Sequence, residues 1–209
     1  MVSIWGYEIR SKTLRQTPFV CPRCGLDRDG TEIEPQRWFA VLHIRVIPLA
    51  TFDRVIQCDT CGHRCDIGVL EIPTTELLAE YLCDAMRHSV IATVRAGIEI
   101  SDDPDSLVRD AAVAAVQATD HDYDDAGLDH DLIELDDNDM GDRLRRLVRE
   151  LTPHGKQSFL HRMTGIALAD GMITPRERRT LIDIGVALGM APPHINGVLA
   201  VATNQYEVA

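Results

Sequence analysis

Two stretches of matching form, CPRCG at residues 21–25 and CDTCG at residues 58–62, decide the fold of the N-terminal part of this chain. In each, two thiols stand two residues apart, and the glycine that follows can adopt a positive φ and direct backbone N–H groups at the sulfurs. The expected ligands are Cys21, Cys24, Cys58 and Cys61. Four thiolates suit a closed, tetrahedral zinc site, so we predict a structural zinc ion that holds a fold and does no chemistry.

Three other interpretations of the cysteines need to be weighed. A disulfide would suit a secreted chain, but no charged leader followed by an apolar segment indicates secretion. A redox pair would need no second matched copy. A different ligand set would use His63 or Cys65, with Cys61-x-x-x-Cys65 in place of Cys58-x-x-Cys61. Only the latter pairing repeats the first motif, so we expect Cys65 in a strand beside the site and Cys83 in a helical core.

Charge is distributed unevenly along the chain of 209 residues, whose net charge is −12. Residues 1–66 hold nine Lys/Arg and eight Asp/Glu, so they carry +1 and the remainder carries −13. That remainder would repel a phosphate backbone, which argues against extended nucleic-acid binding by the C-terminal part. His43 and Arg45 interrupt the longest apolar run, at 38–50, so we also expect no membrane span and a cytoplasmic protein.

The N-terminal region is expected to form short β-strands around the metal. Residues 2–7 and 9–16 are brief segments with β propensity, and an inserted hairpin should fill the long separation between the two motifs. The run 38–47 alternates apolar and polar residues from Leu42 onward, which predicts one buried face. Pro48 should end that strand, because proline cannot donate to a ladder. So small a domain buries too little surface alone, and the zinc is expected to make up the shortfall.

Residues between the two motifs resemble a bacterial zinc-ribbon family. The resemblance lies in Trp38-Phe39, in Ile47-Pro48-Leu49 and in the strand that runs into the second CxxCG, and it covers about residues 4–70. His43 and Arg45 depart from the family's more uniformly apolar pattern. The resemblance implies that the four cysteines ligate zinc in a module that is often attached to another domain and has no agreed activity.

From about Pro73 the hydrophobic period changes from two to 3.6, which predicts an all-helical bundle of about six helices. We expect these helices after Thr74-Thr75, after Asp103-Pro104, at 142–151, around 159–167, at 174–188 and after Pro192-Pro193. The fold class is therefore α+β, with a zinc-ribbon domain at 1–72 and an all-α domain at 73–209.

The stretch 120–142 contains eleven Asp/Glu and no Lys or Arg. It does not fit a calcium-binding EF-hand, because Ile133 and Leu147 stand where the bidentate glutamate belongs. Its composition predicts a flexible, solvated loop. Weak divalent-cation binding or docking of a basic partner is the alternative.

The string IALADGMITPRE at 166–177, with LIxIxxxLGM at 181–190 and IxxVL at 195–199, resembles tellurite-resistance TerB-like domains. The resemblance spans roughly residues 75–205. In that family the unit occurs twice, and here the first copy would be IATVRAGIEIS at 91–101, which has no aspartate after Ala-Gly and no glutamate at the matching place. Membership would imply a role in bacterial stress or tellurite responses through acidic, metal-binding surfaces and protein contacts.

Asp170 and Glu177 allow two interpretations. They could offer carboxylate oxygens to a divalent cation, although one pair supplies too few ligands for calcium. Alternatively, Asp170 closes a turn with its own backbone, while Glu177 completes a capping box with Thr174. We favour the structural interpretation.

No catalytic motif is recognisable, so we expect no enzyme. His154, His161 and His194 could meet in the bundle, but no pattern requires it. We expect a cytoplasmic zinc-binding protein that acts through protein partners. The alternative is a nucleic-acid-associated zinc ribbon, which would need its basic residues on one face and its aromatic residues exposed. Those basic residues are Arg10, Lys12, Arg15, Arg23, Arg28, Arg37, Arg45 and Arg54, and the aromatic ones are Trp5, Trp38 and Phe39.

Overall fold

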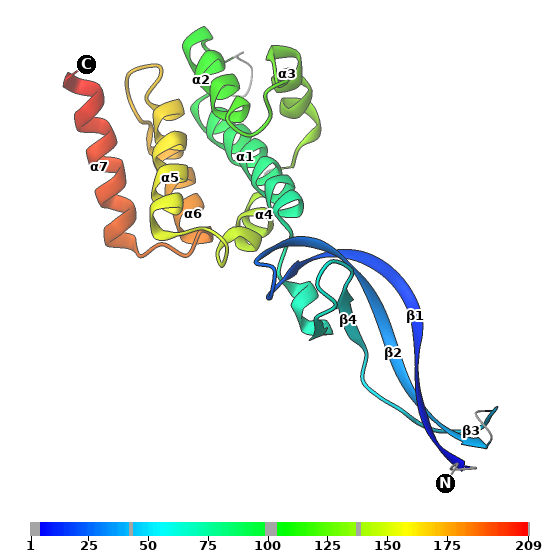
Figure 1. Cartoon of the computed structure of the whole chain (residues 1–209). Coiled ribbons are helices and arrows are strands. Elements are labelled where there is room, and N and C mark those ends of the chain that lie inside the picture. The colour runs from blue at the N-terminus through cyan, green and yellow to red at the C-terminus, as the bar shows by residue number, and fades with distance from the viewer. Residues whose placement is uncertain (1–4, 42–43, 99–103, 137–138, 209) are drawn as a thin grey trace. The chain divides into compact units, whose positions relative to one another are not determined.

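The chain divides into two compact units, Met1–Leu77 and Leu78–Ala209. The computed structural model describes residues 5–41, 44–98, 104–136 and 139–208. Within them the first unit is an antiparallel β-sheet, and the second is built from helices (Figure 1). The predicted α+β class, with β-structure followed by all-α structure, is confirmed.

The first unit is built on a long β-hairpin whose turn is the first cysteine motif. Strand β1 (Trp5–Cys21) pairs with β2 (Leu26–Val41), from Cys21 opposite Leu26 to Trp5 opposite Val41. Strand β2 then pairs with β4 (Val55–Cys58) near the cysteines and with β3 (Ile44–Thr51) farther along. Strand β5 (Arg64–Asp66) pairs with β4, and a 3-10 helix η1 (Ile67–Glu71) follows. The hairpin β2–β3 is the insertion predicted between the two motifs.

Three details of this sheet differ from the sequence-based expectation. The two short strands predicted before the first motif form one strand, β1. Pro48 does not end a strand but lies inside β3, opposite Trp38, where β3 is an edge and the register shifts beside it. The face expected to be buried is exposed at Ile44 and Val46, because no second layer covers this end of the sheet within the described residues.

The apolar core of the first unit is very small. Its one buried cluster consists of Phe19, Cys21, Ile56 and Cys58, with Val69 and Leu70 packed against them, and Ile33 and Ala40 are buried outside this cluster. Gly30 permits this packing, because a Cβ there would lie only 2.5 Å from a ring carbon of Phe19. This unit therefore has almost no hydrophobic interior apart from the neighbourhood of the cysteines.

The second unit is a helical bundle around a large apolar core. Its helices are α1 (Thr75–Gly97), α2 (Ser106–Gln117), α3 (Asp125–Glu134), α4 (Met140–Leu147), α5 (Pro153–Ala167), α6 (Pro175–Ala187) and α7 (Pro192–Val208). Helix α5 packs against α2, α6 and α7, and its predicted apolar stripe, including Leu160 and Met163, is buried. Helix α2 is capped by Asp105 instead of beginning at Pro104; Asp103 lies outside the described residues.

The acidic stretch at 120–142 is not the loop that its composition predicts. Helix α3 occupies its middle and buries Leu128 and Asp131, which raises the helix number of the described bundle to seven. Asp131 accepts hydrogen bonds from both Arg87 on α1 and the hydroxyl of Tyr123. One buried carboxylate with two partners thus anchors a segment that is otherwise too polar to pack.

No helix among the described residues is long and apolar enough to span a membrane.

Candidate metal centre

Four cysteine sulfurs converge at one end of the sheet. Cys21 and Cys58 are the last residues of β1 and β4, while Cys24 and Cys61 lie in the turns that follow. All four Sγ atoms lie within 4.8 Å of one another, and the Sγ atoms of Cys21 and Cys61 are 3.7 Å apart. Four sulfurs at the usual Zn–S distance in a tetrahedron would be separated by about 3.8 Å. The donor set therefore has the size and chemistry of a tetrathiolate metal site.

The two cysteine turns have the same backbone construction. Gly25 donates to the carbonyl of Cys21 at 2.8 Å, and Gly62 donates to the carbonyl of Cys58 at 2.9 Å. The φ angles of the two glycines are 68° and 67°, in the left-handed region that glycine adopts without steric cost. Each CxxCG motif is thus a tight turn that brings its two thiols to the same point.

Contacts between the turns and the sheet hold the second motif in place. The Asp59 N–H donates to the carbonyl of Asp29 at 3.0 Å, and the hydroxyl of Thr31 donates to the Asp59 carboxylate at 2.9 Å. Both partners belong to β2, which continues directly from the first motif. The two turns are therefore linked through protein contacts as well as through any shared metal.

The thiols have unequal affinities for protons. Backbone N–H groups of Cys61 and Thr60 lower the pKa of Cys58 to about 7, although its burial acts in the opposite direction. A hydrogen bond with Cys61, together with burial, raises the pKa of Cys24 to about 12. Because metal ligation requires thiolates, a bound cation would have to displace the proton of Cys24. The affinity of this site for a metal must therefore fall as the pH falls.

The alternative ligands lie next to this group without belonging to it. Cys65 is on β5, half-buried against the cysteine cluster, and burial raises the pKa of its thiol. The His63 carbonyl accepts the N–H of Cys58 at 2.9 Å, while its side chain is exposed. Among the described residues, the four cysteines are the one group of three or more His, Cys, Asp or Glu positioned for a metal. Cys83 lies on a helix, α1, as predicted, but it is only partly buried and does not belong to the helical core cluster.

Asp170 and Glu177 have the contacts of the structural interpretation. Glu177 Oε2 accepts the Thr174 N–H at 2.7 Å, and the Thr174 hydroxyl accepts the Glu177 N–H at 3.2 Å, which completes the capping box. Burial raises the pKa of Glu177, against the opposing effect of these bonds. Asp170 is exposed and accepts the Met172 N–H at 3.4 Å. A Cβ added at Gly97 would lie 2.6 Å from Glu177 Oε1, so this carboxylate also packs on the end of α1.

Several basic side chains of the sheet already interact with other side chains of the protein. Arg15 pairs with Glu32 at 2.7 Å, and Arg54 lies 3.6 Å from the same carboxylate. The Arg37 guanidinium lies 4.2 Å above the ring of Tyr7. Trp38 and Phe39 are half-buried, and the side chains of Trp5 and Arg45 lie outside the described atoms.

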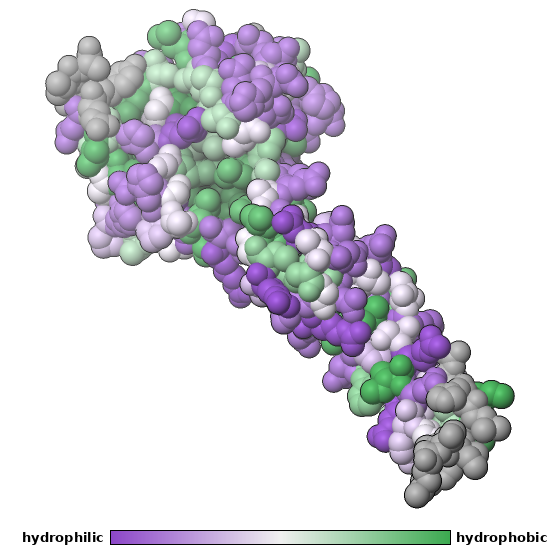
Figure 2. All heavy atoms as spheres, in the orientation of Figure 1, coloured by the Kyte–Doolittle hydropathy of each residue, from purple (hydrophilic) through white to green (hydrophobic). Residues whose placement is uncertain are grey.

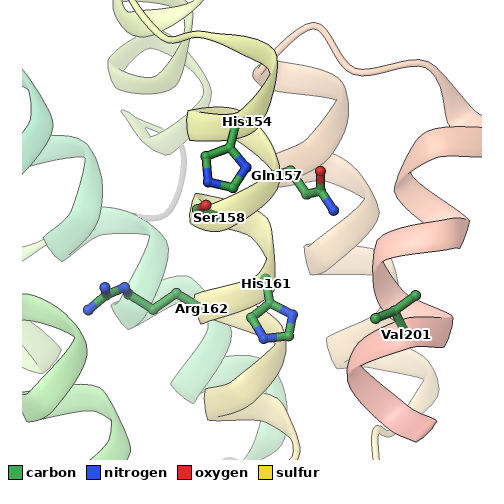
Figure 3. A pocket seen from close by; sticks show the side chains of 6 residues that line it. All are labelled: His154, Gln157, Ser158, His161, Arg162 and Val201. Carbon is green, nitrogen blue, oxygen red and sulfur yellow. The ribbon is translucent and has the colours of Figure 1, made fainter. Parts of the chain in front are cut away.

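Of the three histidines that could have met in the bundle, two lie together. His154 and His161 line one pocket on α5, and His194 does not line it (Figure 3). Sequence patterns did not identify the other lining residues of this pocket, Gln157, Ser158, Arg162 and Val201. One sequence signal could have identified this pocket. Although the chain is strongly acidic, residues 151–169 contain no Asp or Glu.

Comparisons with family models, with curated proteins and with solved structures found no match for this chain.

Proposed function

We propose that Cys21, Cys24, Cys58 and Cys61 bind one structural zinc ion, and that the protein acts through partner binding without catalysis. The observation that supports the proposal best is the convergence of the four sulfurs within 4.8 Å. A tetrahedral set of four thiolates suits zinc or iron. We choose zinc because the paired CxxCG turns are typical of closed zinc knuckles.

The bound zinc would act as a cross-link. It would join the turn after β1 to the turn after β4, across a unit whose buried apolar side chains are few. When bound, zinc would supply four metal–thiolate bonds and no free position for a substrate, which favours a structural role over a catalytic one. The chain's own residues would orient the thiols through the two glycine turns and their contacts with β2.

A partner-binding role is supported by the charge of the helical part. The residues outside the first 66 carry −13, and acidic surfaces attract basic partners at long range. The resemblance to TerB-like domains adds the proposal of a cytoplasmic role in bacterial stress or tellurite responses. Nucleic acid is the weaker candidate, because Arg15, Arg37 and Arg54 of the sheet are already engaged.

Metal analysis of the full-length protein, purified without chelators, tests the zinc assignment. We expect one zinc per chain, and cobalt substitution should give the visible absorption of a tetrahedral tetrathiolate site. Stoichiometric iron in place of zinc, or four thiols that react freely with a thiol reagent in the native protein, would refute the assignment.

Capture of cellular partners at several salt concentrations tests the functional role. Retained partners should be proteins, and their retention should decline as ionic strength rises, because long-range charge attraction is screened. Recovery of nucleic acid as the principal salt-sensitive partner would favour the alternative. An enzymatic activity that a substitution in the helical bundle abolishes, and that persists after removal of zinc, would contradict the proposed absence of catalysis.

A further inference from the structure

We propose that the pocket on α5 is a binding site for a small organic phosphate, which no motif of this chain indicates and which goes beyond the proposed zinc function. The pocket has a volume of about 510 Å³, within the range of roughly 300–1,000 Å³ typical of ligand sites. Its lining residues are His154, Gln157, Ser158, His161, Arg162 and Val201.

The polar side chains of the pocket stand on successive turns of one helix. His154, Ser158 and His161 follow one face of α5, and Val201 faces them from α7 (Figure 3). Arg162 extends on the flank of α5 opposite Val201. Spacings of three and four residues place side chains one above another on a helix. The pocket therefore presents a column of polar groups, with the Val201 side chain on one flank and the Arg162 guanidinium on the other.

Every polar side chain in this lining can donate a hydrogen bond, and none is a carboxylate. Within the described residues, the side chains of Gln157, Ser158 and Arg162 have no hydrogen-bond or ion-pair partner, and the same holds for both histidines. An arginine is always charged and is weakly hydrated, which suits it to phosphate recognition. These groups are thus available to an anion from solution.

The surrounding sequence keeps negative charge away from the pocket. The chain has 33 Asp/Glu among 209 residues, yet none occurs at 151–169 or at 184–206, the segments that contain α5 and most of α7. His154 also lies in the first turn of α5, where Thr152 caps the helix and the helix dipole favours an anion. The pocket lining and the two segments that supply it thus contain no carboxylate that would repel an anion.

The arrangement favours a phosphate monoester with an apolar body. A phosphate has three terminal oxygens and can accept bonds from several turns at once, whereas a carboxylate has two oxygens in one plane. The Val201 side chain and the carbon atoms of the imidazoles offer contact area to an aromatic or aliphatic group. Phenyl phosphate carries both features and is the probe we choose.

The test is a titration of the zinc-loaded, full-length protein with phenyl phosphate, followed by NMR of histidine ring and valine methyl signals. We expect saturable shifts at His154, His161 and Val201, and none at His194. Arg162→Ala should weaken binding about tenfold, since a charge-assisted bond to the phosphate is lost. Arg162 is exposed, so its replacement should leave the circular dichroism spectrum unchanged.

Control variants and control ligands make the result decisive. Arg179→Ala and His194→Ala, both exposed and outside the pocket, should bind phenyl phosphate as the unmodified protein does. Inorganic phosphate and benzoate should each bind more weakly, and benzyl alcohol should not produce the same shifts. The proposal is overturned if the shifts do not saturate, if benzoate binds as tightly as phenyl phosphate, or if Arg179→Ala weakens binding as much as Arg162→Ala.

Discussion

The two units of this chain hold their folds in opposite ways. The β unit has one small buried cluster, formed by Phe19 and Ile56 together with two cysteines, whereas the helical unit buries side chains from every one of α1 to α7 in one cluster. Burial of apolar surface is the main favourable term in folding, so the helical unit can fold by burial alone. We expect the β unit to depend on a cross-link at its cysteines. A loss of metal should therefore affect one unit and a loss of apolar volume the other.

Cys58→Ser tests the metal-dependent half of this comparison and should have the largest effect. Structural zinc contributes about 10–16 kcal/mol of apparent binding free energy in small modules, so we expect the β unit to unfold. Protease sensitivity in residues 5–58 should rise, while the helical signal at 222 nm should stay the same. Cys83→Ser, on α1 and away from the cluster, is the matched control and should retain stoichiometric zinc. Equal protection of the β unit in both variants would refute its dependence on metal.

Leu160→Ala tests whether the helical unit depends on its buried apolar volume. Leu160 is fully buried in the helical core, and such a truncation costs about 2–5 kcal/mol because it leaves a cavity. Urea unfolding followed by circular dichroism should show the loss in the helical transition. Zinc content should not change. A parallel loss of zinc would mean that the units are not separate in stability.

Asp131→Asn tests how the acidic segment is held to the bundle. The Asp131 carboxylate is buried and bonded to Arg87 and Tyr123, and hydrogen bonds to charged groups contribute about 1.5–3 kcal/mol. We expect the helical unit to lose stability by about 2 kcal/mol, together with faster amide exchange in α3. Asp129→Asn is the control, because the pair of Asp129 with Arg109 is exposed and should cost under about 1 kcal/mol. Equal effects of the two changes would contradict an anchoring role for Asp131.

Glu177→Gln should have the smallest effect and a characteristic pH dependence. Glutamine also completes a capping box, so we expect a change below about 1 kcal/mol at neutral pH. Burial raises the pKa of Glu177 above 4.5 in the folded state, so the folded protein binds the proton more tightly than the unfolded chain. The stability that the protonated Glu177 carboxyl contributes to the folded state is therefore complete below pH 4.5. It is lost as the pH rises through the pKa of the folded state.

Thermal unfolding at a series of pH values measures this effect. The thermal stability of Glu177→Gln relative to the unmodified protein should increase as the pH rises from about 4.5. A divalent cation that stabilises the unmodified protein but not the variant would instead support a metal role for Asp170 and Glu177.

Local rules made the cysteine turns and most helices predictable. A CxxCG turn and the Thr174 capping box each depend on residues within a few positions of one another, and the structure contains both. Helix α3 was missed because its buried Asp131 is bonded to Arg87, a partner 44 residues away in the sequence. The place of Pro48 was missed for a similar reason, since its sequence does not show that β3 lies at an edge. Zinc, partners and catalysis remain predictions from sequence.

Strand β3 has a consequence for the behaviour of the protein in concentrated solution. Its exposed residues Ile44, Val46, Ile47 and Leu49 lie on a strand that, within the described residues, pairs on one side only, with β2. Figure 2 shows hydrophobic and hydrophilic surface interspersed along the sheet. Such an edge is a template for pairing with another chain and for fibril growth. Pro48 removes one donor from it, and register shifts at Arg37/Trp38 and Phe39/Ala40 disturb its regular spacing. We expect a strand interrupted in this way to resist edge-to-edge stacking, so that Pro48 would favour solubility by a local device, whereas the helical unit would rely on charge repulsion.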